Sequence, residues 1–482
     1  MKDVSINPGL PSAWRRLQPE TVAPPIGDCT HSPKGGQQAE ASPLARVPPG
    51  SARLHLVNTE SSVSRIPSDK RKPCDGNPAL AQLADVKSLL MLQGPMGSLF
   101  HRIANWKRSL GHRVTRVVFN GGDEYFCPDP EVIEFWHTLR DWPHYLRRLI
   151  LRHEIDGVIL FGQSRPIHRE AIRICRLMGI CVFVMEEGYV RPGFMTLELG
   201  GVNAESTTLG AYRLDENLPV GANVTPARVK HHRLRMTWQA MLYYLFLRLG
   251  ARRYTGYIHH RHSSIFRYAS YWVGAALHYP VTRWRDRKAM AALDQHRPCF
   301  FLPLQIDSDA QVVHHSRFLG VLLFVDEVMQ SFALHASPDA QLVIKQHPLA
   351  RGHLGMRTSI LLMAERYGIR RRVIFVYSCK IYEFLERVAG VVTINSTVGM
   401  QAIAHSVPLK VMGDAIYDHP DVVDPQPLDD FWRNPRKPDP AKALDFYRTL
   451  KILTQVPAAL YDSASVPLAW DDLVPHHSGE RA

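Results

Sequence analysis

Short apolar runs alternate with amphipathic stretches in the first half of the chain. The runs with strand character lie at residues 88–93, 114–119, 156–162 and 180–185. Helical spacing of apolar residues occupies residues 98–110, 131–152 (broken around Pro143) and 166–178. Strands that alternate with helices in this way predict a parallel, doubly wound sheet.

The same alternation returns near Cys299. Strands are expected at residues 299–305, 341–348, 373–378, 391–395 and 408–413. Helices are expected at residues 316–332, 381–388, 400–405 and 440–454. The sequence therefore predicts an α/β protein with two Rossmann-like domains facing a cleft.

Segments of different composition flank these domains. Residues 1–85 are rich in proline, serine and glycine and lack apolar periodicity, so we expect a disordered tail. We assign residues 86–224 to the N-terminal Rossmann-like domain and residues 296–425 to the C-terminal one. Residues 426–482 are expected to hold one helix and a polar tail.

Residues 225–295, which join the two domains, mix arginine, histidine, tryptophan and tyrosine with apolar residues at helical spacing. One interpretation is a pair of packed helices with solvated basic faces. A second is a surface that lies on anionic lipid through a basic amphipathic face. Aromatic residues among arginines can also bind nucleic acid, but no nucleic-acid-binding motif accompanies them.

Charge and cysteine content narrow the class of protein. The 482 residues carry a formal net charge of +13, which favours an anionic partner such as nucleic acid, a membrane surface or a phosphorylated substrate. The seven cysteines form no Cys-x-x-Cys pair, so neither a zinc site nor a disulfide framework is indicated. We see no secretory signal and no apolar run long enough to span a bilayer, and a reducing cytoplasm fits best.

The stretch from Ile180 to Asn203 holds the strongest candidate chemistry of the N-terminal domain. Its apolar run stops at Glu186 and Glu187, so two carboxylates are expected where a strand ends and ligands bind. One acid could instead cap a helix while the other is solvated. A long loop that contains Arg191 is expected to follow, and long loops in compact domains are usually functional.

The other three strands of this domain also end in polar or glycine-rich loops. These loops begin at Gln93, at Asn120-Gly121-Gly122-Asp123 and at Gly162. Because the carboxyl ends of parallel strands share one rim of the sheet, we expect a pocket there.

In the C-terminal domain, Asn395-Ser396-Thr397 brings two hydroxyl groups to the first turn of a helix. Free backbone N–H groups and the helix dipole attract an anion at that place, although an ordinary N-cap has the same sequence. Lys345 and His347 end a strand that we expect to be its neighbour, and they can add charge and a donor to the same oxygens. Pro348 fixes the backbone that follows. The sequence therefore predicts a phosphate site.

Asp307 and Asp309, together with Gln305 and Gln311, can bind either a metal ion or the hydroxyls of a ribose or base. We favour the hydroxyls, because no third acid or histidine pair completes a metal set. Neither a G-x-G-x-x-G motif nor a P-loop is present, which argues against a dehydrogenase and a P-loop kinase.

Seven segments occur in a defined order between residues 88 and 422. They are LQGPMGSLF, FNGGDEYF, EEGYVRPGFMTLELGGVN, FLPLQIDSDAQVVHHS, IKQHPL, INSTVGMQA and GDAIYDHP. In this order they resemble the bacterial capsular polysaccharide biosynthesis proteins of the KpsS/LipB type, from which the N-terminal tail departs.

This resemblance implies a GT-B-type glycosyltransferase fold and a β-Kdo transferase that uses CMP-Kdo as donor substrate, with no metal or other cofactor. The acceptor would be a phosphatidylglycerol-type lipid at the cytoplasmic face of the inner membrane, and the product would start the poly-Kdo linker of capsular polysaccharide. The protein would be peripheral on that anionic membrane through residues 225–295. Its partners would be the nucleotide sugar, the lipid acceptor and other capsule assembly proteins, but no nucleic acid.

The resemblance also implies roles for single residues in the donor site. His347, Pro348, Ser396 and Thr397 would hold the CMP phosphate beside Lys345, while Gln305 and Asp309 would line the rest of the site.

The acids of the N-terminal domain would then perform the sugar chemistry. Related Kdo transferases carry Glu-Asp-Gly where this chain has Glu186-Glu187-Gly188. A retaining transfer needs a carboxylate nucleophile and a nearby acid/base group. We therefore expect Glu187 as nucleophile, Glu186 and Asp123 as acid/base candidates, and Arg191 as the partner of the Kdo carboxylate. A GT-B transferase with another donor, such as CDP-glycerol or a UDP-sugar, and a non-catalytic component of capsule assembly or export remain alternatives.

Overall fold

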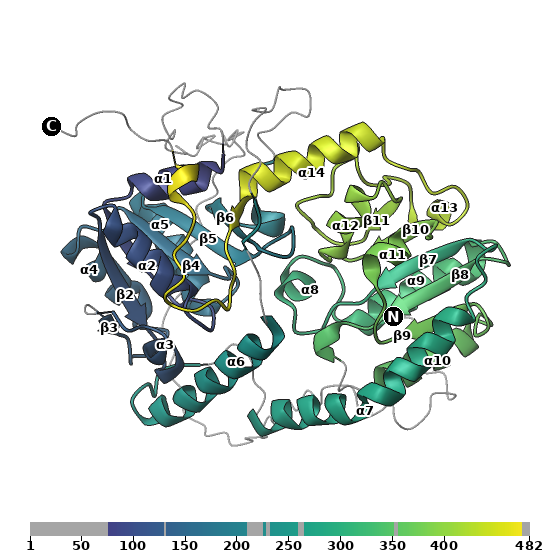
Figure 1. Ribbon diagram of the computed structural model, residues 1–482, viewed down its shortest axis with the longest axis horizontal. Helices are drawn as coiled ribbons and strands as arrows, with labels where there is room; N and C mark the ends of the chain where they lie inside the picture. The colour runs from purple at the N-terminus through teal and green to yellow at the C-terminus, as the bar shows by residue number, and fades with distance from the viewer. Residues whose placement is uncertain are drawn as a thin grey trace, which may run out of the picture. The chain divides into compact units, whose positions relative to one another are not determined.

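The computed structural model describes residues 76–129, 132–209, 225–227, 232–258, 265–350 and 355–474 (Figure 1). Two sheets organise these residues, and each has its own core. Most of the tail expected at residues 1–85, up to residue 75, lies outside the described residues.

The first sheet has seven strands in the order β12-β6-β5-β4-β1-β2-β3. The strands are β1 (Ser88–Met91), β2 (Arg113–Val118), β3 (Val132–Glu134), β4 (Gly157–Phe161), β5 (Cys181–Glu187), β6 (Phe194–Leu199) and β12 (Gln455–Pro457). Strands β1 to β5 are parallel, and β6 is antiparallel to both β5 and β12. Because β1 pairs with both β2 and β4, the chain changes direction across the sheet between them, and this is the switch point where ligands bind in such sheets.

Both faces of this sheet are apolar, as the continuous apolar runs predicted. On β1, Leu89 packs toward one core and Leu90 toward the other. One face is covered by α1 (Pro78–Asp85) and α2 (Leu99–Ser109), and the other by α4 (Trp142–Arg152) and α5 (Pro166–Met178). The short helix α3 (Gly121–Tyr125) follows β2.

The second sheet has five parallel strands in the order β11-β10-β7-β8-β9. The strands are β7 (Cys299–Pro303), β8 (Gln341–Lys345), β9 (Val373–Val376), β10 (Gly390–Thr393) and β11 (Leu409–Val411). The helices around it are α8 (Ala310–His314), α9 (Val321–His335), α10 (Gly355–Arg366), α11 (Ile381–Leu385), α12 (Val398–Ala404), α13 (Leu428–Phe431) and α14 (Pro440–Thr454). The predicted fold class, α/β with two Rossmann-like domains, is confirmed.

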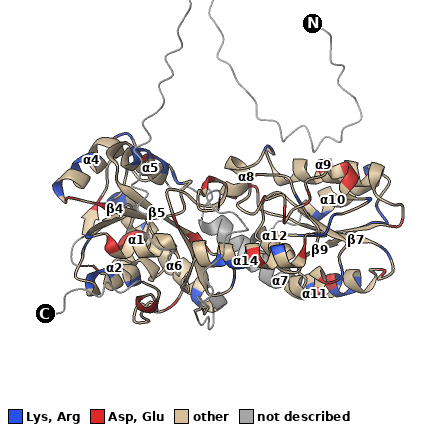
Figure 2. Cartoon of the chain, turned by 90° about the horizontal axis from the view of Figure 1, so that it is seen from above, with Lys and Arg blue, Asp and Glu red and all other residues tan. Residues whose placement is uncertain are grey.

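Between the sheets in sequence lie α6 (His232–Leu249) and α7 (Ile265–Ala291), the predicted pair of helices. α6 contains no acidic residue and α7 contains one, Asp286. Figure 2 shows both helices from above, with lysine and arginine in blue and aspartate and glutamate in red. The Asp286 carboxylate is buried and accepts hydrogen bonds from the backbone N–H groups of Tyr377 (2.8 Å) and Ser378 (2.9 Å), just after β9. This contact fixes α7 to the second sheet. None of the helices described is both long and apolar enough to cross a membrane.

Two predicted elements of the N-terminal domain differ from the structure. The helix expected at residues 131–152 is strand β3 followed by α4, because Pro143 lies in the first turn of α4, where proline is tolerated, and does not interrupt a longer helix. The long loop expected after Glu187 contains strand β6. This strand was not predicted because the acidic Glu198, which is buried in the structure, interrupts the apolar pattern expected of a buried strand.

The tail expected at residues 1–85 is wrong for its last turns, which form α1. The Asn77 side chain caps this helix by accepting a hydrogen bond from the Leu80 N–H at 2.9 Å, and Leu80 and Leu83 are fully buried. At the C-terminal end of α1, the buried Lys107 ammonium donates hydrogen bonds to the backbone carbonyls of residues 83, 84 and 86. A helix this short gains its stability from the core that it covers.

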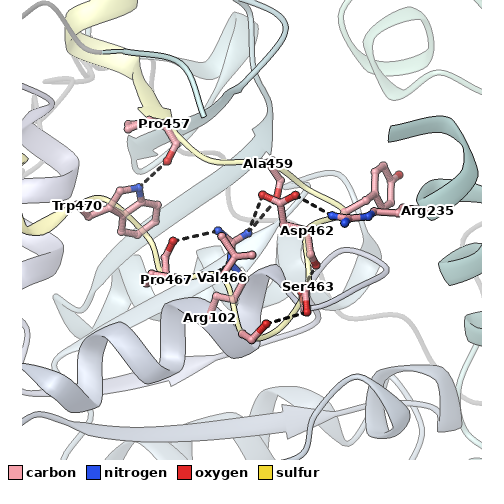
Figure 3. Close-up of polar contacts among 12 residues, drawn as sticks. Arg102, Arg235, Pro457, Ala459, Asp462, Ser463, Val466, Pro467 and Trp470 are labelled. Atoms are coloured by element: carbon pink, nitrogen blue, oxygen red, sulfur yellow. Dashed lines mark hydrogen bonds and ion pairs between the residues drawn. The ribbon is translucent and has the colours of Figure 1, made fainter. Parts of the chain in front are cut away.

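The polar tail expected within residues 426–482 is also wrong up to Trp470. After α14, the chain adds β12 to the first sheet and buries Trp470, whose indole N–H donates to the Pro457 carbonyl at 3.0 Å (Figure 3). The Arg102 guanidinium of α2 donates to the carbonyls of Ala459 (3.0 Å) and Val466 (2.6 Å). The end of the described chain is therefore part of the N-terminal domain.

Candidate functional site

The loops after β1 and β2 come together, as predicted, around the carboxylate of Asp123. This carboxylate is buried and accepts hydrogen bonds from the side chains of Gln93 (2.9 Å), Asn120 (2.8 Å) and Tyr243 of α6 (3.0 Å). Burial raises the pKa of Asp123, while the Arg165 charge and the hydrogen bonds from Tyr243 and Gln93 oppose the rise. Protein donors occupy both of its oxygens, an arrangement that fixes α6 in place.

The two glycines before Asp123 explain how α6 comes so close. A Cβ atom on Gly121 would lie 2.3 Å from the Phe246 carbonyl oxygen, and one on Gly122 would lie 2.8 Å from the Tyr243 ring. Only glycine leaves room for this helix contact. The Asn-Gly-Gly-Asp sequence is thus a docking site for α6, a role that the sequence reasoning missed.

The two acids after the apolar run of β5 do not share one environment. Both lie within the strand, where Glu186 pairs with Thr196 and Glu187 with Met195 across the hairpin. Successive side chains of a strand point to opposite faces, so one carboxylate points inward and the other outward. The expectation of an acid pair beyond the end of the strand is therefore corrected.

Glu186 is the inward-pointing acid. Its carboxylate accepts a hydrogen bond from the Asn203 side chain at 2.7 Å. Burial raises the pKa of Glu186 to about 7, and the nearby negative charges of Asp309 and Glu187 raise it further, against the Asn203 hydrogen bond. Asp309 comes from the C-terminal domain, so acids predicted in the two domains act on each other.

Glu187 is the outward-pointing acid, with a side chain that is 52% exposed. It forms an ion pair with Arg191 at 2.9 Å, and the Arg191 Nε donates to the Gly188 carbonyl at 2.9 Å. In the structure, Arg191 therefore has a carboxylate partner within its own chain.

A third carboxylate belongs to the β5–β6 hairpin and was not predicted. Glu198 of β6 is buried and accepts hydrogen bonds from the hydroxyls of Tyr189 (2.9 Å) and Ser206. Burial raises the pKa of Glu198 to about 7 against these hydrogen bonds. The Tyr189 hydroxyl also accepts the Asn203 N–H, which links Glu198 to the partner of Glu186. A strand pattern in residues 194–199 was the signal that could have revealed it.

In the C-terminal domain, Gln305 and Asn395 meet at the ends of β7 and β10. The Gln305 amide donates to the Asn395 side-chain oxygen at 2.9 Å, and the Asn395 N–H donates back to Gln305 at 3.3 Å. β7 pairs with both β8 and β10, so this contact lies at the switch point of the second sheet.

The residues predicted to bind phosphate lie on both sides of this switch point. Ser396 and Thr397 precede α12, where the Ser396 hydroxyl accepts the Val398 N–H at 3.3 Å. Lys345 is buried at the end of β8. The expectation that the two strands are neighbours is wrong, because β7 lies between them. At about 4.8 Å per strand, their ends are roughly 10 Å apart.

His347 and Pro348 continue from the end of β8. His347 is half-buried, and its carbonyl accepts the Ala350 N–H at 3.0 Å across the short turn that Pro348 begins. They therefore lie on the Lys345 side of β7.

Asp307 and Asp309 both cap helices. Asp307 accepts the Val321 N–H of α9 at 2.7 Å, and Asp309 accepts the Gln311 N–H of α8 at 3.0 Å. No group of three or more histidine, cysteine or acidic side chains suited to a metal ion occurs among the residues described.

A small pocket with a volume of about 80 Å³ opens at the rim of the first sheet. It is mostly apolar, and its polar lining includes Gln93, His137 and Arg165. The Arg165 guanidinium also donates to the Gly94 carbonyl at 3.2 Å. The pocket therefore lies beside the Asp123 network.

Comparison with known proteins defines the class to which this fold and site belong. Residues 156–461 match the family of capsule polysaccharide biosynthesis proteins, and the chain belongs to this family. The predicted resemblance to the KpsS/LipB type is confirmed by two relatives. The capsule polysaccharide export protein KpsS of Escherichia coli is 36% identical over 387 residues, which cover 80% of this chain and 99% of KpsS. The capsule polysaccharide modification protein LipB of Neisseria meningitidis serogroup A is 33% identical over 405 residues, covering 80% and 94%.

Solved structures are more distant. The Thermosulfurimonas dismutans KpsC β-Kdo 2,7 transferase aligns with a TM-score of 0.37 and 13% identity, covering 74% of this chain and 89% of that chain. A similarity at this level carries no argument about the reaction.

Proposed function

We propose that the protein is a glycosyltransferase that transfers Kdo from CMP-Kdo to a phosphatidylglycerol-type lipid and so starts the poly-Kdo linker of capsular polysaccharide. The observation that carries this proposal is the environment of Glu186. A carboxyl group at the end of β5, with a pKa of about 7, lies near Asp309 of the nucleotide-binding candidate domain. A pKa near neutrality is what an acid/base catalyst needs.

The chemistry follows as a double displacement with retention. The exposed Glu187 carboxylate attacks the anomeric carbon of Kdo, and CMP leaves with the bonding electrons. Glu186 lies on the other face of β5 but near enough for the Glu187 charge to raise its pKa. It then takes the proton of the acceptor hydroxyl, whose oxygen displaces Glu187 from the anomeric carbon. Arg191 holds the Glu187 carboxylate at 2.9 Å before the donor binds and can turn to the Kdo carboxylate afterwards. Asp123 supports this rim from its buried network.

The donor is held by the C-terminal domain in this proposal. Gln305 lies at the switch point, with Ser396 and Thr397 on one side of β7 and Lys345, His347 and Pro348 on the other. A nucleotide is large enough to contact groups roughly 10 Å apart. No metal ion or other cofactor is required for this scheme.

The test is a transfer assay with the purified protein, CMP-Kdo generated in situ and a fluorescent phosphatidylglycerol analogue, read by product mass. One added Kdo supports both the donor and the acceptor, and Glu187→Gln should abolish the product. CMP binding in calorimetry without transfer would favour the alternative of another donor, such as CDP-glycerol or a UDP-sugar.

Absence of both transfer and CMP binding would favour a non-catalytic component of capsule assembly or export. In the proposed role the protein works at the cytoplasmic face of the inner membrane with other capsule assembly proteins.

A further inference from the structure

One face of α6 is apolar and exposed. It consists of five residues whose exposed fractions lie between 52% and 75%: Leu234, Trp238, Met241, Leu245 and Leu249. We call this face the α6 stripe. At about 100° and 1.5 Å per residue, it is roughly 80° wide and about 22 Å long.

The opposite face of α6 is packed against the N-terminal domain. Tyr243 is buried, with its hydroxyl bonded to Asp123 at 3.0 Å, and the Phe246 ring stacks on Tyr125 with ring centroids 3.9 Å apart. These contacts fix the rotation of the helix about its axis, so the α6 stripe faces away from the N-terminal domain. A continuous apolar surface of this kind usually marks an interaction site.

The charge around the α6 stripe indicates what covers it. Residues 217–285 contain no aspartate or glutamate and eleven lysines and arginines, in a chain whose formal net charge is +13. Arg235 and Arg248 lie on opposite sides of the α6 stripe at helical spacing. Arg248 forms no ion pair with any residue that the structure describes, whereas Arg235 pairs with Asp462 at 3.3 Å.

We propose that the α6 stripe inserts into the surface of an anionic phospholipid bilayer, with the flanking arginines at the level of the headgroups. Apolar residues with tryptophan on one face and arginines at its borders are the composition of helices that lie in a membrane interface. A second copy of the chain fits less well, because it would bring two acid-free basic segments together. The inference rests on the proposed function, since it places the catalytic domain beside a lipid acceptor.

The experiment is flotation of the full-length protein with vesicles of phosphatidylethanolamine and phosphatidylglycerol, and with vesicles of phosphatidylcholine alone. The test variant is the double substitution Trp238→Ala and Leu245→Ser. Its control is Leu151→Ser on α4, which removes a side chain that is 70% exposed. Circular dichroism and thermal unfolding check that each variant folds, and Met241→Gln replaces the double variant if it does not fold.

We expect the wild type and Leu151→Ser to float with the anionic vesicles. The double variant should bind roughly tenfold more weakly or worse, since it loses much of the buried apolar area. Added salt should weaken wild-type binding because it screens the arginines. Unchanged binding by the double variant would overturn the proposal. The proposal would also fail if the wild type does not bind anionic vesicles but forms a dimer that the double substitution disrupts.

Transfer activity separates this inference from the proposed function. If the protein transfers no sugar to any acceptor but binds vesicles through Trp238 and Leu245, the transferase proposal fails and the membrane surface stands. If the double variant transfers sugar to a detergent-dispersed acceptor but not to one in vesicles, both proposals are supported.

Discussion

Two carboxyls of the β5–β6 hairpin, Glu186 and Glu198, allow stability and catalysis to be tested separately. Burial raises the pKa of both Glu186 and Glu198 from 4.5 to about 7. We predict that Glu198→Gln and Glu186→Gln both stabilise the protein at alkaline pH, but that only Glu186→Gln abolishes transfer. Glu198 is the matched control because it is an equally perturbed acid that faces Tyr189 and Ser206 inside the domain.

The magnitude follows from linkage. A carboxyl whose pKa is higher in the folded than in the unfolded state costs nothing below pH about 4.5, and the cost grows until the pH passes about 7. At about 1.4 kcal/mol per tenfold change in proton affinity, the full cost is about 3 kcal/mol. The stability advantage of Glu198→Gln over the wild type should therefore grow by about 2.5 kcal/mol as the pH rises from about 5 to about 8. The gain for each variant should be smaller by up to about 1 kcal/mol, because one amide cannot accept every hydrogen bond of the carboxylate that it replaces.

The assay is equilibrium unfolding in urea at both pH values, followed by far-UV circular dichroism, beside the transfer assay. A stability difference between wild type and Glu198→Gln that does not change with pH would refute the assignment of a raised pKa to burial. Transfer that survives Glu186→Gln would remove Glu186 from the proposed chemistry. Loss of transfer in Glu198→Gln would show that the whole hairpin, and no single acid, controls activity.

Three further outcomes are expected. Gly122→Ala should destabilise the protein by about 1–3 kcal/mol in thermal unfolding, because the new Cβ would meet the Tyr243 ring at 2.8 Å. Gly274→Ala, within α7, should be neutral or stabilising by up to about 1 kcal/mol, since nothing lies within 4 Å of its Cβ; equal effects of the two changes would contradict the docking of α6. Tyr243→Phe should cost about 1–3 kcal/mol by removing a donor from a buried carboxylate, and no loss of stability would show that the hydroxyl is dispensable. His347→Ala should weaken CMP binding in calorimetry by about 1.5–3 kcal/mol, the value of a hydrogen bond to a charged group, and unchanged affinity would exclude His347 from the donor site.

The meeting of strand-end loops was predictable from the sequence. The loops after β1 and β2 meet at Asp123, and Gln305 meets Asn395 at the switch point of the second sheet. Both follow from the rule that parallel strands end at one rim. The order of strands was not predictable from local sequence, and so Lys345 was expected next to Ser396, although β7 separates them.

The sequence alone determined the fold class, because the period of apolar residues separates helices from strands before any long-range contact forms. It determined helices α5 and α14 with their observed bounds, each with a proline in its first turn. The Asn-Gly-Gly-Asp sequence was equally visible, but its purpose depends on a helix more than a hundred residues away.

Only the tertiary structure decided which acids of the β5–β6 hairpin are buried and which one forms an ion pair. It also added Glu198, which the sequence had not indicated. Glu186, Glu187 and Glu198 are the same residue type, and nothing local assigns a pKa of about 7 to two of them and an ion pair with Arg191 to the third. A pKa depends on desolvation and on charges that folding brings within range, such as the Asp309 charge that raises the pKa of Glu186. These distances exist only after the chain has packed, which is why the chemistry of this hairpin had to be found in three dimensions.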